Sequence, residues 1–444
     1  MCGALGYPLG IGVTKGEPPW RGRPRILGAA VGGDRVMSAQ SSMQTLPAPS
    51  EDASVETQTA VKAARVDSID LLRGIVMIVM AIDHSRDFFS GDMFDPTDLT
   101  RTNPALFFTR IVTHICAPTF MLLAGTGAYL SFARGKSRAE VSRFLLTRGI
   151  AFVLAEQTIM RFAWRFKLYL LPIDGSTMWG LGWSMIALSA LVFLPIRWMA
   201  VFGAAIVLLH NLLDPFTAQS WGSLRIVWVF LHGGFFGTPE HPILGVGYAI
   251  IPWAGVMALG FALGPIVHWA PARRRRFLSL AGLLLTLGFV VLRFTNWYGD
   301  HHPWSPQASP LFTVMSFLTT EKYPPSLLFL MMTLGPMLLL LSVLERWKGP
   351  AADLLLVYGR VPLFYYFAHI YLLHALALAL AAIVHKPLPW TAAWALSGPP
   401  IPNYGWELPV VYLMWIVTVV ALYPACKWYM GLKRRSDFWL LGYL

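Results

Sequence analysis

Charged residues are scarce in this sequence: they make up 13% of its 444 residues. Soluble globular domains usually carry about 25%. A shortfall of this size excludes an ordinary soluble domain as the main body of the chain. It favours a protein whose surface faces lipid.

Cysteine is also scarce, and common enzyme motifs are missing. The three cysteines, Cys2, Cys116 and Cys426, form neither a metal-ligand spacing nor a disulfide framework. The sequence contains no phosphate-binding glycine loop, HExxH or GxSxG motif. We therefore expect no bound metal and no soluble enzyme carried on a membrane anchor.

Hydrophobic residues, in contrast, make up 56% of the sequence. Apolar runs of roughly 18 or more residues recur along the chain, and a helix of that length crosses a hydrocarbon core of about 30 Å. The 18 tryptophans, 27 phenylalanines and 15 tyrosines are typical of two aromatic belts at the membrane surfaces. We predict an all-α, polytopic bundle of about ten transmembrane helices in a lipid bilayer, at residues 67–89, 108–132, 142–164, 179–195, 198–213, 246–269, 276–294, 325–345, 361–385 and 409–430. Two further stretches, 222–236 and 310–320, are expected to lie in the membrane interface.

The beginning of the chain has a different composition. Residues 1–62 are rich in Gly, Pro, Ser and Ala and show no sustained periodicity, so we predict that they are disordered. Met37 is an alternative start, in which case residues 1–36 are not translated. The membrane domain is expected to cover residues 63–444.

The net charge of +12 lies largely in short loops between apolar runs, such as Arg273–Arg276. The positive-inside rule explains such clusters, and we expect no nucleic-acid partner. Ten spans place both termini on one side, together with most of the basic loops, so we predict cytoplasmic N- and C-termini. The loop containing Arg161, Arg165 and Lys167 runs against this assignment.

Ionisable residues inside apolar helices are costly in lipid and point to a function. In the first helix, Asp70 and Arg73 can pair on one face. His84 lies about 20° from Arg73 and about 40° from Asp70 around the helix axis, so the three form one stripe that extends roughly 16–21 Å. Asp83 and Asp87 flank His84 and can fix its tautomer and raise its basicity. A structural ion pair and a hydrogen-bonded histidine are the alternative.

Other helices add candidates. His114 enters the second helix from the same side as His84, where it can join a site or merely cap a kink around Pro118. Arg148, in the third helix, can help Arg73 to hold an anion. Arg360 precedes Pro362, which suits the first turn of a helix.

That last helix continues with Tyr365, Tyr366, His369 and His374, a face that suits a substrate channel or simple packing between helices. The loop 296–326 combines Trp and Tyr with Asp, Asn and Lys, as sugar-binding surfaces do. The pair His301-His302 in this loop can bind metal, but the sequence offers no spaced third ligand.

Several of these motifs resemble those of a known membrane-protein family. The chain resembles a bacterial membrane family grouped with the catalytic domain of heparan-alpha-glucosaminide N-acetyltransferase, from about residue 65 to residue 444. The matching motifs are Ser68-Ile-Asp70-Leu-Leu-Arg73-Gly74, Asp83-His84-Ser-Arg86-Asp87, His114-Ile-Cys-Ala-Pro118, Tyr323-Pro-Pro-Ser326 and Gly359-Arg360-Val-Pro362.

The resemblance implies a transmembrane acyltransferase in the bacterial inner membrane. Such an enzyme takes an acyl group from cytoplasmic acyl-CoA (acetyl-CoA) and passes it to an amino sugar or other glycan on the outside. The animal enzyme uses a histidine of the first non-cytoplasmic loop, but residues 90–107 contain none. The catalytic role therefore falls to His84, with His114 as second choice and Asp87 as its helper.

A CoA donor needs cations for its phosphates on the cytoplasmic side. Arg73, Arg148 and Arg360, together with Asp70, are the candidates. The alternative function is a membrane transporter or a non-catalytic membrane protein. Transporters often show a repeated half, and we find no such repeat here. The sequence leaves open the acceptor, the acyl group and whether the chain forms a homodimer.

Overall fold

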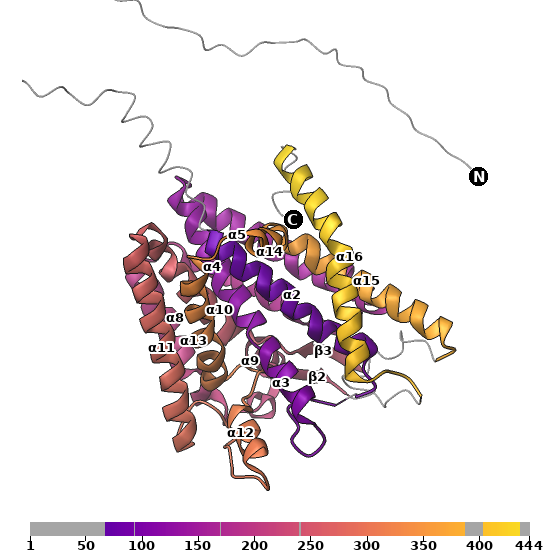
Figure 1. Ribbon diagram of the computed structural model, residues 1–444. Helices are drawn as coiled ribbons and strands as arrows, with labels where there is room; N and C mark the ends of the chain where they lie inside the picture. Colours follow the sequence, from indigo (N-terminus) through magenta and orange to yellow (C-terminus); the bar gives the residue numbers. More distant parts are fainter. Residues whose placement is uncertain (1–66, 93, 169, 239–240, 387–402, 436–444) are drawn as a thin grey trace, which may run out of the picture. The chain divides into compact units, whose positions relative to one another are not determined.

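The computed structural model describes residues 67–92, 94–168, 170–238, 241–386 and 403–435. This part of the chain is a bundle of α-helices with one small sheet (Figure 1). The predictions for residues 1–62, including the disorder, the start at Met37 and the domain boundary, lie outside the described residues.

The helices follow one another with short connections. The first half contains α2 (Asp67–Phe89), α3 (Pro104–Thr113), α4 (Cys116–Ala133), α5 (Arg138–Ala155), η1 (Glu156–Met160), α6 (Arg161–Arg165), α7 (Thr177–Leu191), α8 (Ile196–Leu209), η2 (His210–Leu213), η3 (Ala218–Leu224) and α9 (Arg225–His232). The second half contains α10 (Ile250–Leu263), η4 (Gly264–His268), α11 (Pro271–Thr295), α12 (Pro310–Leu318), α13 (Leu327–Leu344), α14 (Pro350–Arg360), α15 (Pro362–Ile383) and α16 (Leu408–Arg435). Side-chain caps set several starts: Asn103 caps α3, and Ser326 caps α13.

Seven helical stretches of the described residues are long and apolar enough to cross a membrane. They are Pro104–Ala133, Ile196–Leu213, Ile250–His268, Pro271–Thr295, Leu327–Leu344, Pro362–Ile383 and Leu408–Arg435. The other three expected spans are also helical, as α2, α5 and α7. Charged residues interrupt α2 and α5, and α7 has only 15 residues. The total of ten spans therefore stays a prediction.

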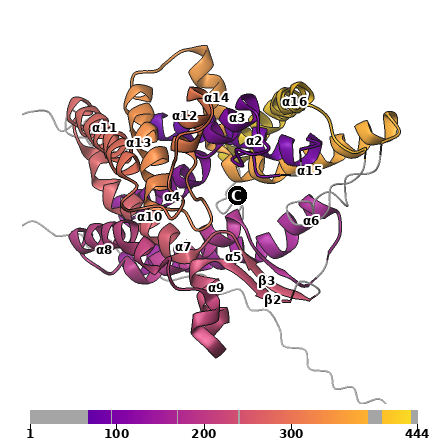
Figure 2. The ribbon, with the colours of Figure 1, turned by 90° about the horizontal axis from the view of Figure 1, so that it is seen from below.

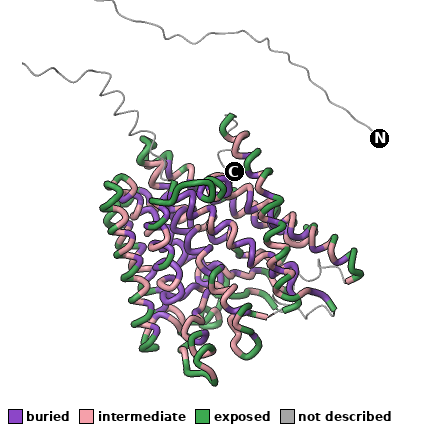
Figure 3. The backbone as a smooth tube through the Cα atoms, viewed as in Figure 1, coloured by how far each residue is buried: buried purple, intermediate pink, exposed green. Residues whose placement is uncertain are grey.

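The outer helices present apolar side chains to the surroundings. Only 22% of the apolar window of α11 and 17% of that of α16 are buried, against 72% in α13. Figure 3 shows the same division, with buried residues along the middle of the bundle and exposed ones at its rim. On α11 the exposed residues include Leu280, Leu284, Leu287 and Val291. An apolar rim on helices of this length fits contact with the hydrocarbon core of a membrane.

The bundle is mostly helical, as predicted, but it also contains a small three-stranded sheet that the sequence analysis did not predict. Its strands are β1 (Ile173–Gly175), β2 (Gly234–Gly237) and β3 (Pro242–Val246), in the order β1-β3-β2. β3 pairs parallel with β1 and antiparallel with β2. The strands were missed because they are three to five residues long and rich in glycine, so no alternation marks them. Of the two expected interfacial segments, 222–236 forms part of η3, α9 and part of β2, and 310–320 forms α12.

Helix α2 runs through the middle of the bundle (Figures 1 and 2). It contacts α14, α15 and α16 on one side, and α3, α4 and α13 on the other. The indole of Trp415 on α16 donates a hydrogen bond of 2.8 Å to the Ile78 carbonyl of α2. The side chains of α2 therefore meet protein partners around most of the helix.

Two glycines let α2 and α14 touch through their backbones. A Cβ atom at Gly74 would lie 2.2 Å from the carbonyl oxygen of Leu355, and one at Gly359 would lie 1.8 Å from that of Asp70. Real side chains do not fit at such distances, so only glycine permits this approach. The contact brings the Asp70–Gly74 motif against the Gly359–Pro362 motif.

We predict that Gly359→Ala lowers the free energy of unfolding by roughly 1–3 kcal/mol, because the added methyl group has to push two backbones apart. Gly127 on α4 is a matched control, since a Cβ atom there would meet nothing within 4 Å. Gly127→Ala should be neutral or slightly stabilising. Thermal unfolding of the detergent-solubilised variants measures the difference, and equal melting temperatures for the two would contradict the packing role.

Candidate active site

Charged side chains gather where α2 ends. Arg110 of α3 pairs with Asp83 of α2. Arg86 bridges the two neighbouring aspartates, at 3.4 Å from Asp83 and 2.7 Å from Asp87. Lys322 is buried and lies close enough to contribute its positive charge to the same region. We call these five residues the charged cluster; three cations against two carboxylates leave one positive charge in excess.

His84 lies beside this cluster and meets a second histidine. Its Nδ1 atom is 2.6 Å from Nε2 of His369 on α15. The two rings are almost parallel, with centroids 4.9 Å apart and an interplanar angle of 18°. His369 is fully buried, whereas His84 is half-buried. The stripe on α2 thus faces the protein interior, toward α15.

The hydrogen bonds determine which nitrogen of His84 carries its proton. Nδ1 of His369 lies 2.8 Å from the Tyr365 carbonyl, which can only accept, so this nitrogen must donate. In the neutral ring, Nε2 of His369 is then an acceptor, and Nδ1 of His84 donates to it. Nε2 of His84 is left with a lone pair, and it has no hydrogen-bond partner among the described residues. An unprotonated, unpartnered imidazole nitrogen can act as a base or a nucleophile.

Aromatic rings hold His84 on its other sides. The indole of Trp164 on α6 meets it edge-on, with centroids 5.2 Å apart. The ring of Tyr366, which lies about one turn before His369 on α15, is also edge-on to His84, with centroids 6.4 Å apart. Trp164 in turn stacks on Phe88, 5.0 Å away. The orientation of the imidazole is therefore restricted by packing as well as by His369.

Neither Asp83 nor Asp87 makes the contact that fixes the tautomer of His84. Asp83 pairs with Arg110 and Arg86, and Asp87 pairs with Arg86. His369 takes the place of a carboxylate in setting the tautomer of His84. The sequence analysis named Asp87 as the helper of His84, whereas the structure assigns the orienting contact to a residue 285 positions away.

His114 lies at the junction between α3 and α4, as the kink interpretation expects. Its backbone N–H donates to the carbonyls of Arg110 and Ile111. The ring is buried against Phe329, with centroids 5.2 Å apart. Within the described part of the chain, Nδ1 of His114 has no hydrogen-bond partner. The charges of Arg110 and Lys322 act on His114 as well, so it borders the charged cluster from the α4 side.

Tyr323 follows Lys322 in the loop before α13. The ammonium of Lys322 lies 5.2 Å from the centre of the Tyr323 ring. Desolvation raises the pKa of the Tyr323 phenol, but the charges of Lys322 and Arg110 outweigh it and leave the pKa below its ordinary value. The loop thus adds an acidic phenol beside the surplus positive charge.

At the other end of α2, three of the four expected donor-binding residues come together. Arg73 binds Asp70 at 2.9 Å. Arg360 pairs with Asp67 at 3.2 Å and lies 4.0 Å from Asp70. Arg148, the fourth, lies on α5 near the rings of Phe144 and Phe152.

A small cavity lies near this end of α2. Its walls are mostly apolar and come from α2, α4, α10, η4, α11 and α13. Arg274 and Glu345, which form an ion pair with each other, supply the charged groups of the lining. The cavity lies on the face of α2 turned toward α4 and α13, and its lining residues do not include Asp70, Arg73, Arg148 or Arg360.

Two other ionisable residues, Glu156 and His374, have structural roles. Glu156 accepts hydrogen bonds from the backbone N–H groups of Met178 and Trp179 at the start of α7. His374 stacks on Phe166, 3.9 Å away, and contacts the Ala163 carbonyl. Both fix the short η1–α6 segment that carries Trp164.

The comparisons agree with these observations. A family model described as heparan-alpha-glucosaminide N-acetyltransferase, catalytic, matches residues 65–298, which include α2, the α3–α4 pair and the start of the loop after α11. No curated protein matches the chain. The match covers more than half of the sequence, so the chain belongs to the heparan-alpha-glucosaminide N-acetyltransferase catalytic family.

Proposed function

We propose that the protein is a transmembrane acyltransferase that moves an acetyl or similar acyl group from cytoplasmic acyl-CoA to an amino sugar or glycan on the other side of the membrane. The observation that carries this proposal is the Nε2 atom of His84, which has no hydrogen-bond partner among the residues that the structure describes. His369 orients this imidazole beside a cluster with surplus positive charge. Family membership supports the chemistry. The acceptor and the direction of transfer are our inference.

His84 suits the role of general base. As the acceptor amine attacks the thioester carbon, its proton passes to Nε2 of His84 while the new N–C bond forms. The C–S bond then breaks, and the CoA sulfur leaves and takes up a proton. A positioned histidine contributes roughly 100- to 10,000-fold to such a step.

The positive charges of the cluster suit the stabilisation of the oxyanion that forms during acyl transfer. Attack on a thioester places negative charge on the carbonyl oxygen, and preorganised cations or donors stabilise it best in a site that excludes water. Arg110 is tied to Asp83, and Arg86 to both aspartates, so Lys322 is the cation best placed to respond to a new negative charge. The phenol of Tyr323 beside it can donate a hydrogen bond to the same oxygen.

The donor end is proposed to lie where α2 begins. The guanidinium groups of Arg73 and Arg360 lie there beside Asp70, and guanidinium groups bind phosphates well. Arg73 and His84 are 11 residues apart on α2, or roughly 16 Å along the helix. An extended pantetheine arm is the part of CoA that would cover this distance.

The proposed orientation can be tested by labelling. In intact cells, a membrane-impermeant maleimide should modify Asp92→Cys, in the exposed turn after α2, because we place that turn outside. Lys136→Cys, in the exposed turn between α4 and α5, should react only after permeabilisation. The native Cys116 and Cys426 are buried and give little background, and both variants also carry Cys2→Ser so that the third native cysteine does not react. A cytoplasmic Asp92→Cys would reverse the topology.

The catalytic role of His84 predicts a large loss of rate. With purified protein, radiolabelled acetyl-CoA and a panel of amino sugars and envelope glycans, His84→Ala should transfer at least roughly 100-fold more slowly than the wild type. It should still fold, as judged by its melting temperature. Loss in His114→Ala instead, with normal activity in His84→Ala, would move the role to His114. If both variants stay active, histidine is not the catalyst.

His369 is a positioning residue in this proposal, and its variants should separate orientation from packing. His369→Leu removes the acceptor for Nδ1 of His84 and should lower kcat by roughly 10- to 100-fold with little change in KM. In His369→Gln the amide oxygen can still accept that hydrogen bond, so part of the rate should return. Equal activity in the Leu and Gln variants would show that the hydrogen bond does not matter.

A further inference from the structure

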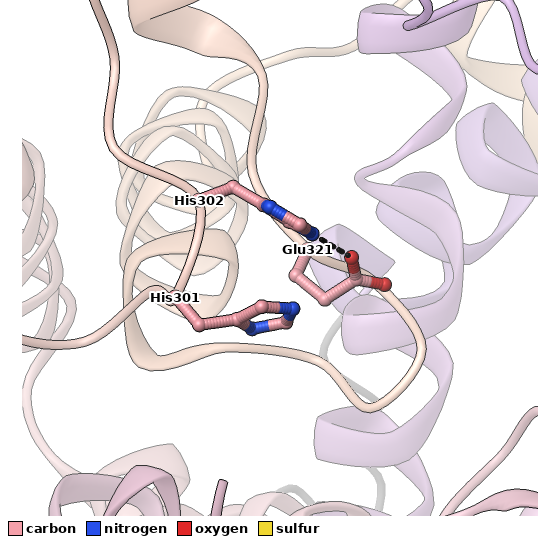
Figure 4. Close-up of side chains that lie close together, drawn as sticks. All are labelled: His301, His302 and Glu321. Carbon is pink, nitrogen blue, oxygen red and sulfur yellow. Dashed lines mark ion pairs between the residues drawn. The ribbon is translucent and has the colours of Figure 1, made fainter. Parts of the chain in front are cut away.

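Three metal-binding side chains meet in the loops on the side of the bundle where α2 ends. They are His301, His302 and Glu321 (Figure 4). One ligand atom from each lies within 4.8 Å of the others. Nε2 of His302 is 3.4 Å from a carboxylate oxygen of Glu321. The sequence shows the two histidines, but only the fold supplies a third ligand.

These separations fit a tetrahedral ion. Zn–N and Zn–O bonds of about 2.0–2.2 Å at tetrahedral angles put ligand atoms roughly 3.3 Å apart. The His302–Glu321 distance already has this value. Closing the widest gap requires a shift of roughly 1.5 Å. Both histidines are exposed, His302 by 60% of its side chain, so a rotation of the imidazole rings can supply that shift.

A network of hydrogen bonds holds the two loops in register around the three ligands. Both carboxylate oxygens of Asp300 are used: one accepts from the His302 backbone N–H at 2.9 Å, and the other from the backbone N–H of Glu321 and the hydroxyl of Ser326. Glu321 itself accepts from the Tyr323 N–H through one oxygen, at 2.9 Å. Its other oxygen points to His302, so the carboxylate is aimed before any ion arrives.

We propose that His301, His302 and Glu321 bind a zinc ion that ties residues 300–302 to the loop before α13. Two imidazoles and a carboxylate are the ligand set of many zinc sites, whereas Mg²⁺ and Ca²⁺ prefer oxygen ligands throughout. A fourth position stays open for water. The site is separate from the His84–His369 pair and does not depend on the proposed acyl transfer.

Zinc bound at Glu321 would restrict the motion of Lys322 and Tyr323 through the backbone that joins these residues. Glu321 is followed directly by Lys322 and Tyr323, which border that cluster. Fixing the Glu321 side chain restricts the backbone of the next two residues. The ion is therefore expected to stiffen the loop that carries these groups.

Zinc binding by the purified full-length protein, carrying an affinity tag without histidine, tests the site. Titration against a chromophoric zinc chelator should give about one ion per chain. His302→Ala and Glu321→Gln should each weaken binding by roughly 10-fold or more, in line with the loss of a zinc ligand. His241→Ala is the matched control, because His241 is also exposed and lies in a loop outside the three-ligand cluster. Equal binding by all variants, or no stoichiometric binding by the wild type, would overturn the proposal.

Hydrogen exchange provides a second readout that needs no enzyme activity. Zinc should slow amide exchange in residues 319–326 of the wild type and leave it unchanged in Glu321→Gln. Unchanged exchange in a zinc-bound wild type would refute the link between the two loops. Failure of acyl transfer in the same preparation would bear on the proposed function alone.

Discussion

The contact between α2 and the α14–α15 pair is the constraint on which the rest of the site depends. Gly74 and Gly359 allow the two backbones to touch near the start of α2. The same pairing places Arg360 beside Asp70, and further along it places His369 against His84. One helix–helix interface therefore aligns the ion pairs at one end of α2 with the histidine pair toward the other. A shift of α2 along α14 and α15 would separate the ion pairs and the histidine pair at the same time.

Charge inside the bundle is stabilised almost entirely by pairing. An unpaired arginine or aspartate at the centre of a membrane helix costs about 2.5–3.5 kcal/mol or more. Asp83, Arg86, Asp87 and Arg110 form a continuous chain of ion pairs, which reduces that cost. Lys322 leaves the cluster with an excess of one positive charge. Buried ion pairs add little net stability to a fold, and a positive charge in excess of the carboxylates adds a cost. The excess charge is therefore better explained by an anion that the site binds than by a contribution to stability.

Local patterns in the sequence were enough to predict part of this arrangement. The stripe formed by Asp70, Arg73 and His84 follows from helical periodicity alone, and Pro362 starts a helix as its fixed φ angle requires. The partner of His84 could not be predicted in this way, because His369 is 285 residues away and only the fold brings it near. Helix α14 was missed for a different reason: Pro350–Arg360 is amphipathic rather than a long apolar run. Glu321, the third ligand beside His301 and His302, again depends on loop packing.

The charged character of α2 has a consequence for how the protein is made. This helix leaves the ribosome before the other described helices, yet its charges make it a poor candidate for independent insertion into lipid. The partner of His84 follows 285 residues later, which corresponds to roughly 15–60 s of synthesis at 5–20 residues per second. During that interval α2 has to be sheltered by the insertion machinery or by α3 and α4, its nearest neighbours in the chain. Assembly of the bundle therefore ends with the late helices α14, α15 and α16 packing onto the first of the described helices.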